Sequence, residues 1–311
     1  AEGRVLSQDI VSPLALPGFD RAAMDGFAVR SEDTRDARPH APVFLERFLA
    51  VRTGMPVPGQ YDAVVMLEDC KLRGCILEIT AQLHPFKNVS RIGEDVAAGE
   101  KVFSQGHTLR PPDLSLLSAL WIENVEVYHR PNVAIIPTGG ELLDIGSRPL
   151  GPGEAYEINS LMARLYAQKW GASAHKTEIV TDDQRLIREA VAANESADLI
   201  IIIGGTSVGE KDYVPRILSE MGELLVHGVR LQPGKPTAIG VVAGKPVVCL
   251  PGYPVAMLFD LYLFVRPALQ RIGHRSDPQP KVRAALTRKI PSRPGYLSLV
   301  RVALQGDQAE P

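Results

Sequence analysis

The residues best suited to chemistry are glycines that follow apolar segments of the chain. Residues 200–213 read IIIIGGTSVGEKDY, and the turns PTGGEL (137–142) and LPGYP (250–254) also follow apolar runs. Gly204 and Gly205 can adopt positive φ angles and leave their backbone amides uncovered, and such successive N–H groups bind anions. The pattern therefore favours a phosphate-binding site, although one such turn alone also fits an ordinary strand-to-helix connection.

Charged and hydroxyl side chains close to these turns extend the possible chemistry. Asp212 lies shortly after the Gly pair. A carboxylate beside a bound phosphate repels it unless a cation intervenes, and Mg²⁺ takes oxygen ligands from both groups. Asp212 is therefore either a magnesium ligand or a helix N-cap, and Ser207 is either a cap or a hydrogen-bond donor to phosphate.

Two further residues have both a structural and a functional interpretation. Lys235 stands between Gly234 and Pro236, and a proline restricts the residue before it to extended conformations, so the lysine is held in one direction. It is either a solvated charge or a contact for a phosphate or another oxyanion. Asp25 precedes Gly26, and because Asp-Gly is a common turn pair, this pair alone indicates a turn before it indicates a site.

An alternation of strands and helices from residue 131 onward predicts the element that positions these turns. We expect a strand and Gly turn in 132–143, strands in 175–180 and 197–205, helices in 158–171, 181–195 and 212–222, and a strand, turn and long helix in 246–273. The run at 197–205 is apolar on both faces, as central parallel strands are. Such alternation predicts a mostly parallel sheet with helices on both faces, which binds ligands beyond the carboxyl ends of its strands.

Polar residues mark the starts of two of these helices. Asn159 or Ser160 is expected to cap the helix at 158–171. Asp182 or Asp183 lies near the positive end of the following helix, where a carboxylate is favourable.

The chain before residue 131 is rich in proline, glycine and short apolar runs. Strands are expected in 41–51, 61–70 and 74–83, a loop at 53–62, a helix starting near Pro111 or Pro112, and short strands again in 281–290 and 296–305. A length of 311 residues also indicates more than one domain.

Composition and charge exclude several classes of function. The chain is 45% hydrophobic with a net charge of −2, which is typical of a soluble globular protein and gives no basic field for nucleic acid. No apolar run approaches the roughly 20 residues of a membrane span, and the first residues lack the apolar core of a signal peptide. The cysteines Cys70, Cys75 and Cys249 are few, odd in number and without zinc-like spacing, so we expect a reducing, cytoplasmic location.

The motifs together resemble those of one family, the MoeA/gephyrin-type molybdopterin molybdenumtransferases, over nearly the whole chain. The resemblance rests on the order and spacing of GRVLSQDIVSPLALPGFDRAAMDGFAV (3–29), TGMPVPGQYDAVVMLED (53–69), RIGEDVAAGE (91–100), PTGGELL (137–143), GGTSVGEKDY (204–213), LQPGKP (231–236), LPGYPVA (250–256) and YLSLVRVAL (296–304).

The resemblance implies an α/β multidomain protein that forms a homodimer. Its parts would be a discontinuous helical domain (1–20 and 91–130), a β-rich inserted domain (21–90), a MogA-like, doubly wound, mostly parallel sheet domain that binds molybdopterin (131–274) and a small C-terminal β-barrel (275–311). The site of the family lies between the α/β domain of one subunit and the inserted domain of the other.

The family inserts molybdate into adenylylated molybdopterin in a magnesium-dependent reaction that cleaves the pyrophosphate bond and releases AMP. The resemblance thus implies a transferase of molybdenum cofactor biosynthesis, with Mg²⁺ as cofactor and with molybdate and adenylylated molybdopterin as substrates. It also suggests molybdopterin adenylyltransferase, molybdoenzyme apoproteins or their chaperones as partners, and neither nucleic acid nor a membrane.

The resemblance assigns roles to individual residues. Asp25 matches the aspartate of the family motif MDG and Asp212 that of GGxSxGxxD, and with Glu141 they are the expected catalytic and metal-binding carboxylates. The residues expected to bind the substrate are Thr138, Gly139, Gly204, Gly205, Ser207, Gly209, Lys235, Pro251 and Gly252.

Two positions depart from the family pattern. The motif TGDE reads TGGE, so Gly140 replaces an aspartate that is a magnesium-binding or catalytic carboxylate, and Glu141 stands one position away. The motif PGNP reads PGYP, so Tyr253 adds volume and a hydroxyl to the pocket. Loss of one carboxylate from a metal site lowers a rate by orders of magnitude when that group holds the metal or a water in the transition state.

These departures leave two alternatives to an active insertase. One is a degenerate relative that binds molybdopterin or a partner protein without turnover. The other is a relative that inserts tungstate or acts on another nucleotide-linked pterin, because molybdate and tungstate are tetrahedral dianions of similar size.

Overall fold

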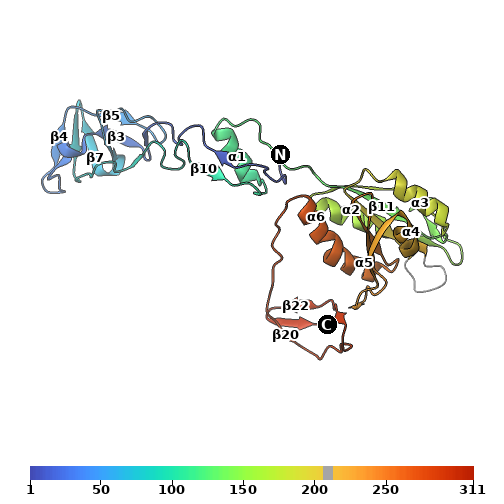
Figure 1. Ribbon diagram of the computed structural model, residues 1–311. Coiled ribbons are helices and arrows are strands. Elements are labelled where there is room, and N and C mark those ends of the chain that lie inside the picture. The colour runs from blue at the N-terminus through green and yellow to red at the C-terminus, as the bar shows by residue number, and fades with distance from the viewer. Residues whose placement is uncertain (206–212) are drawn as a thin grey trace. The chain divides into compact units, whose positions relative to one another are not determined.

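The computed structural model describes residues 1–205 and 213–311. The chain divides into two compact units: an N-terminal unit, Leu6–Glu126, and a C-terminal unit, Val127–Pro311 with Ala1–Val5. Figure 1 labels several elements of each unit. Among the described residues, no helix is long and apolar enough to cross a bilayer.

Small antiparallel sheets build the N-terminal unit. Their strand orders are β5–β3–β6, β4–β8–β7, β2–β9 and β1–β10. The strands are β1 (Ile10–Val11), β2 (Arg21–Ala22), β3 (Gly26–Val29), β4 (Val43–Leu45), β5 (Leu49–Val51), β6 (Ala63–Met66), β7 (Cys70–Arg73), β8 (Ile76–Ile79), β9 (Val89–Ser90) and β10 (Lys101–Phe103). Residues 21–90 are therefore rich in strands, and residues 53–62 form a loop broken only by an isolated bridge at Pro56, as predicted.

The segment 41–51 forms two strands, so the prediction of one strand is wrong. β4 pairs with β8 in one sheet, whereas β5 pairs with β3 in another. Glu46 and Arg47 are exposed at the bend between them. Because successive side chains of a strand point to opposite faces, a strand continued through this pair would bury one of the two charges.

Segments far apart in the sequence pair within the N-terminal unit. β1 pairs with β10, and Leu16 forms a bridge with Val96, so parts of 1–20 and 91–130 come together. Helix α1 (Pro111–Ala119) begins at its two prolines, as predicted, because the first turn of a helix needs no internal N–H donors. The limits of the discontinuous domain stay a prediction.

One six-stranded sheet, β14–β11–β15–β19–β18–β16, organises the C-terminal unit. Its strands are β11 (Asn132–Pro137), β14 (Ser173–Lys176), β15 (Leu199–Ile203), β16 (Gly222–His227), β18 (Ala238–Val242) and β19 (Lys245–Leu250). β14, β11, β15 and β19 are parallel to one another, and β18 runs antiparallel to both its neighbours. The chain passes from β11 to β14 on one side and on to β15 on the other, which confirms the doubly wound, mostly parallel sheet.

The edge strand β14 ends earlier than the predicted strand 175–180. It pairs with β11 as far as Lys176. Beyond it, the chain follows β11 only through a bond from Thr177 N–H to the Ile135 carbonyl oxygen and through the bridge between Val180 and Thr138. An edge strand has a partner on one side only, so its regular pairing ends where the chain bends away from the sheet.

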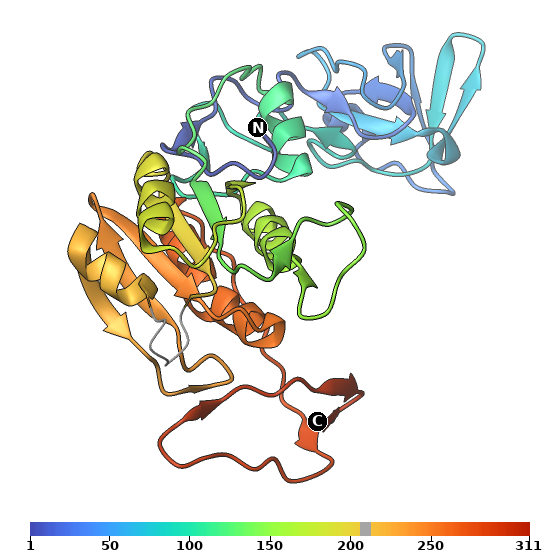
Figure 2. The ribbon, with the colours of Figure 1, turned by 90° about the vertical axis from the view of Figure 1, so that its right-hand side faces the viewer.

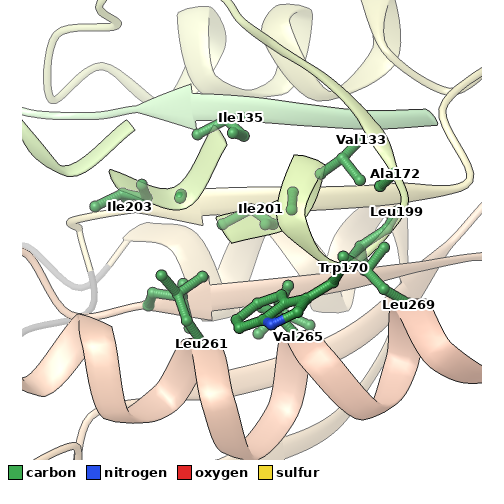
Figure 3. Close-up of a cluster of buried hydrophobic side chains, with 14 of the residues drawn as sticks. Val133, Ile135, Trp170, Ala172, Leu199, Ile201, Ile203, Leu261, Val265 and Leu269 are labelled. Atoms are coloured by element: carbon green, nitrogen blue, oxygen red, sulfur yellow. The ribbon is translucent and has the colours of Figure 1, made fainter. Parts of the chain in front are cut away.

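Alternate residues of the central strand face opposite layers of helices. The helices are α2 (Asn159–Lys169), α3 (Gln184–Ala193), α4 (Tyr213–Met221), α5 (Pro254–Asp260) and α6 (Arg266–Ile272). Leu199, Ile201 and Ile203 pack with α2, α5 and α6 in the cluster of Figure 3, and Ile200 and Ile202 pack with α3 and α4. Consecutive isoleucines therefore fill both layers, because the side-chain period of a strand is two.

The long helix predicted after LPGYP contains one wide turn. α5 continues through a π-helical segment, η3 (Leu261–Val265), into α6. Pro267 lies in the first turn of α6 and has no backbone N–H to donate, so the regular hydrogen-bond ladder is interrupted just before it.

The predicted helix caps have different outcomes. Asp183 lies at the positive end of α3, as predicted, and it also caps the helix by accepting two backbone N–H bonds from the first turn. The prediction for α2 is wrong, because neither Asn159 nor Ser160 caps the helix. The Glu157 carboxylate instead accepts the Ser160 N–H at 2.8 Å, where it also complements the helix dipole.

Residues 275–311 form short strands, as predicted. β20 (Ala285–Leu286), β23 (Gln308–Glu310) and β22 (Ala303–Gln305) form a sheet, and β21 (Leu297–Ser298) pairs with β17 (Leu231–Gln232). Figure 2 shows these C-terminal strands in red. The pairings do not form a closed ring, so the β-barrel stays a prediction.

β3 requires glycine at its first residue, and this requirement can be tested. A Cβ on Gly26 would overlap the carbonyl oxygen of Val65 on β6. We expect Gly26→Ala to lower the free energy of unfolding of the N-terminal unit by about 1–3 kcal/mol, the usual cost of overpacking. Gly59→Ala is the control, because open space surrounds that position. Urea titration followed by circular dichroism measures both, and a Gly26→Ala midpoint equal to wild type would contradict the close approach.

Candidate functional site

Three strand ends meet at one edge of the large sheet. β11, β15 and β19 end at Pro137, Ile203 and Leu250, and each continues into one of the predicted Gly-rich turns. The Thr138 N–H donates to the Ile203 carbonyl oxygen at 2.8 Å, and the Gly204 N–H donates to that of Leu250 at 3.0 Å. The strand order reverses between β11 and β15, which is where open α/β sheets bind ligands. The predicted convergence of the three turns is therefore confirmed.

The Gly pair has the predicted backbone but not two uncovered amides. Gly204 and Gly205 have φ angles of +99° and +65°. A Cβ on Gly204 would lie 2.5 Å from the Thr138 carbonyl oxygen, and one on Gly205 would lie 2.8 Å from Cγ2 of Val214. The Gly204 N–H is already bonded to the Leu250 carbonyl oxygen. The Gly204 amide is therefore not free to bind an anion.

A cavity of about 630 Å³ lies at these turns, within the usual range of small-molecule sites. The predicted site residues that line it are Thr138, Gly139, Glu141, Gly204, Gly205, Lys235, Pro251 and Gly252. Ser207, Gly209 and Asp212 lie outside the described residues. Residues from separate parts of the C-terminal unit therefore share one space.

Other polar side chains line the same cavity without having been predicted as site residues. They are Glu157, Asn159, Asp182 and His227. Sequence reasoning considered Asn159 only as a helix cap and Asp182 only as a charge near the positive end of a helix, and it gave the other two residues no role. Asp182 follows the strand predicted at 175–180, so its place just after a parallel strand was a signal that it lies at the ligand-binding edge.

The loop that carries Lys235 is fixed by a buried carboxyl group of α5. Asp260 is fully buried, and its Oδ2 accepts a hydrogen bond from Oγ1 of Thr237 at 2.6 Å. Gly234 has a φ of +117°, and a Cβ there would overlap Oδ1 of Asp260. Position 234 therefore requires glycine for two reasons: a Cβ would clash with Asp260, and other residues rarely adopt this positive φ. The sequence signal for Asp260 was its position as a single acidic residue in the apolar run 256–265.

Burial changes the acidity of Asp260. Loss of hydration raises the pKa of its carboxyl group to about 7, and the hydrogen bond from Thr237 opposes this shift. Its Oδ1 has no hydrogen-bond partner among the described residues. Ionisation of the buried Asp260 carboxyl group therefore costs free energy.

The carboxylates of the cavity do not form a closed metal cage. Glu141 and Asp182 are exposed, and the Glu141 carboxylate bends back to within 2.9 Å of where a Cβ on Gly139 would lie. Residues 1–205 and 213–311 contain no group of three His, Cys, Asp or Glu side chains placed to hold a metal. Mg²⁺ usually binds one or two carboxylates together with waters and substrate phosphates. The oxygen donors therefore fit a magnesium ion that arrives with a phosphate.

Asp25 belongs to the N-terminal unit, at the turn before β3. Its Oδ1 accepts hydrogen bonds from the backbone N–H of Thr53 at 2.7 Å and from its Oγ1 at 2.8 Å. The backbone bond from Thr53 is the main reason that the pKa of Asp25 lies below its usual value. The structure therefore joins the MDG motif to the TGMP segment, and it leaves the Asp25 side chain exposed.

The two departures from the family pattern lie in accessible positions. Open space surrounds Gly140, and its φ is outside the left-handed region, so a larger side chain fits there. Tyr253 lines the cavity directly before α5, and its side chain is largely exposed. Neither position is constrained by core packing.

Comparisons with known families cover both units. A family model described as "MoeA N-terminal region (domain I and II)" matches residues 1–120, and one described as "Probable molybdopterin binding domain" matches residues 134–271. These matches define the class of protein: an N-terminal MoeA region followed by an α/β domain that matches the family described as a probable molybdopterin binding domain.

Individual relatives agree with these matches. Molybdopterin molybdenumtransferase 2 of Mycobacterium tuberculosis is 38% identical over 98% of this chain and 81% of its own length. A molybdopterin molybdenumtransferase of Haemophilus influenzae is 33% identical over 88% of this chain and 71% of its own. The crystal structure of a molybdopterin biosynthesis MoeA protein from Pyrococcus horikoshii has a TM-score of 0.87 at 31% identity and covers 100% of this chain and 82% of that one. The chain belongs to the MoeA family.

The raised pKa of Asp260 makes stability depend on pH. The folded state binds this proton more tightly than the unfolded chain, so the stabilisation is fully present below about pH 3.8 and is lost as the pH rises through about 7. We expect the free energy of unfolding to fall across this range with a slope that approaches about 1.4 kcal/mol per pH unit. Asp260→Asn cannot titrate and should lack this contribution.

Urea unfolding from about pH 5 to about pH 8 measures the effect as the difference between wild type and variant. The exposed substitution Asp307→Asn is the control, and it should follow the wild type. A pH slope of Asp260→Asn equal to that of wild type would show that Asp260 does not carry the effect.

Proposed function

We propose that this protein catalyses the insertion of molybdate into adenylylated molybdopterin, in molybdenum cofactor biosynthesis. The pyrophosphate bond of the substrate is cleaved and AMP leaves. The observation that carries the proposal is the cavity at the sheet edge, which combines the three Gly-rich turns with Lys235 in a chain of the MoeA family. The names of the relatives, molybdopterin molybdenumtransferases, give the transferase reaction.

The groups in the cavity suit a substrate with a pyrophosphate. Lys235 supplies a positive charge, and charge-assisted bonds to phosphate are stronger than neutral ones. Gly205 lines the cavity with a φ of +65°, a backbone conformation that glycine adopts without strain. Donors fixed in place before the reaction stabilise negative charge as it develops, which is usually the largest contribution to catalysis.

Mg²⁺ is the cofactor of the proposed reaction. Glu141 and Asp182 would hold it, and Asp212 is a further candidate that lies outside the described residues. When bound, the ion would neutralise the pyrophosphate oxygens and polarise the bond that is cleaved. Glu141 stands in for the family aspartate that Gly140 replaces.

The proposed enzyme is a homodimer in which Asp25 of one subunit completes the cavity of the other. Support comes from the motif match and from the exposed carboxylate that Thr53 holds in place. Such an isologous arrangement makes two equal sites. Light scattering that gave a monomer at micromolar concentration would rule it out. Molybdopterin adenylyltransferase, as supplier of the substrate, and molybdoenzyme apoproteins or their chaperones, as receivers of the product, are the proposed partners.

One observation favours a second function, binding of molybdopterin without turnover. Gly140 provides no carboxylate at the position of the family aspartate. A binding protein would keep the cavity and lose only the metal chemistry. Insertion of tungstate is a variant of the first function, and competition between the two oxyanions in the same assay separates them.

Release of AMP tests the reaction itself. We expect AMP from adenylylated molybdopterin only when both molybdate and Mg²⁺ are present. Lys235→Met keeps the aliphatic stem but removes the charge, so it should lower the rate by about a hundred-fold or more. The exposed substitution Lys289→Met is the matched control. AMP release that ignores molybdate, or a Lys235→Met enzyme as fast as wild type, would be evidence against the proposal.

Restoring the family carboxylate separates the two functions. Position 140 has room for a side chain, so Gly140→Asp should fold like wild type. We expect the rate of AMP release to change by less than about ten-fold, because Glu141 already supplies a carboxylate to the magnesium site. A gain of about a hundred-fold or more would instead support the binding function. Unfolding curves of both proteins check that the variant keeps its stability.

A further inference from the structure

One buried hydroxyl group lies between two acceptors beneath the loop that carries Lys235. Oγ1 of Thr237 lies 2.6 Å from Oδ2 of Asp260 and 2.8 Å from the carbonyl oxygen of Gly234. Thr237 and Asp260 are both fully buried. A threonine hydroxyl carries one proton, so it can donate to only one of these two oxygens at a time. The direction of its hydrogen bond therefore depends on whether Asp260 is ionised.

An ionised Asp260 turns the Thr237 hydroxyl away from the loop. A carboxylate only accepts hydrogen bonds, and a bond to a charged acceptor is stronger than one to a neutral carbonyl group. The hydroxyl then donates to Asp260, and the Gly234 carbonyl oxygen keeps only the backbone N–H of Thr237, at 3.2 Å. The turn before Lys235 thus loses one hydrogen bond.

A neutral Asp260 completes a chain of hydrogen bonds from α5 to this turn. Its acid proton can be donated from Oδ2 to Oγ1 of Thr237, which leaves the threonine proton for the Gly234 carbonyl oxygen. That carbonyl group belongs to the peptide unit that joins Gly234 to Lys235. The carbonyl oxygen of Lys235 itself accepts the Val229 N–H at 2.9 Å. Both carbonyl groups next to the Lys235 side chain are therefore held when Asp260 is neutral.

Burial makes both forms of Asp260 accessible near neutral pH, because it raises the pKa of the carboxyl group to about 7 against the Thr237 bond. The elements around it carry titratable side chains, among them Tyr166 of α2, Cys249 of β19, Tyr262 of η3, Lys235 of the loop, and Arg301 and Glu310 of the C-terminal segment. In the described part of the chain, none of these side chains is a cause of the raised pKa. The state of Asp260 therefore follows its own burial.

We propose that neutral Asp260 is a positioning residue for Lys235, acting through Thr237, and that its ionisation weakens the binding of anions in the cavity. The proposal deepens the proposed function and rests on it, since Lys235 is the proposed contact for the pyrophosphate. Lys235 lines the cavity, whereas Asp260 is fully buried beneath the loop. A loop that is fixed before binding loses less conformational freedom when the ligand arrives, so the neutral form binds an anion more tightly.

Sulfate binding to the full chain tests the proposal, because sulfate stays a dianion from about pH 5.5 to about pH 8 and adds no titration of its own. Asp260→Asn keeps a donor toward Thr237 but cannot ionise, so it mimics the neutral form. By calorimetry, it should match wild type at about pH 5.5 and bind sulfate about five-fold more tightly than wild type at about pH 8, the effect of one net hydrogen bond. The exposed substitution Asp307→Asn is the control and should follow wild type at both pH values.

Thr237→Val separates positioning from a direct effect of the Asp260 charge. Valine keeps the branched shape but cannot pass on the hydrogen bond. Positioning predicts that this variant binds sulfate about five-fold less tightly than wild type at about pH 5.5, where Asp260 is neutral in both proteins. A direct charge effect predicts equal affinities at that pH. Thr287→Val is the matched control, because it also removes a hydroxyl that donates to a carbonyl oxygen, on the exposed C-terminal segment.

The two variants give independent ways to overturn the proposal. Equal affinities of Thr237→Val and wild type at about pH 5.5 would do so, and so would equal affinities of Asp260→Asn and wild type at about pH 8. A wild type that binds no sulfate at either pH would also overturn it. Asp260→Asn remains decisive if unfolding curves show that Thr237→Val does not fold. Failure of the proposed function looks different, because the wild type would then show both differences in sulfate affinity but release no AMP with molybdate and Mg²⁺.

Discussion

The backbone bonds between three strand ends constrain the whole site. Thr138 is tied to Ile203 and Gly204 to Leu250, so the three turns cannot move independently. Each turn follows a strand whose alternate side chains are buried in opposite helical layers. A shift of register by one residue would exchange these layers, so the core fixes the positions of the turns. The cavity therefore owes its shape to the packing beneath it.

In both units, a closely packed glycine lies next to a charged residue that is a candidate for the site. In the N-terminal unit, Gly26 lies against the carbonyl of Val65 and sets the position of Asp25. In the C-terminal unit, Gly234 lies against Asp260 and sets the position of Lys235. In each case the missing Cβ permits a close approach that fixes the neighbouring charged side chain. Close packing thus fixes the backbone beside each charged side chain, and Thr53 also holds the Asp25 carboxylate through two hydrogen bonds.

The site is supported by buried polar groups that an apolar core would not contain. Asp260, Glu157 and Asn159 each leave a buried atom without a partner among the described residues. Such atoms cost free energy, and proteins tolerate that cost where it holds a functional loop or meets a ligand. Asp260 lies under the Lys235 loop, and the other two residues line the cavity. Both placements are consistent with a fold that gives up some stability for its site.

The sequence by itself determined the doubly wound sheet, the convergence of the Gly-rich turns and the family. These follow from local signals, such as the apolar run at 197–205, the positive φ that Gly204 favours and the order of the motifs. Only the tertiary structure decided that the Gly204 amide is already bonded, that Glu157 rather than Asn159 or Ser160 serves the start of α2, and that Asp260 lies under Lys235. The physical reason is that periodicity and turn chemistry are local signals, which indicate the face of a strand or helix on which a residue lies. A hydrogen bond or a steric contact depends instead on which residue, distant in the sequence, packs against that face.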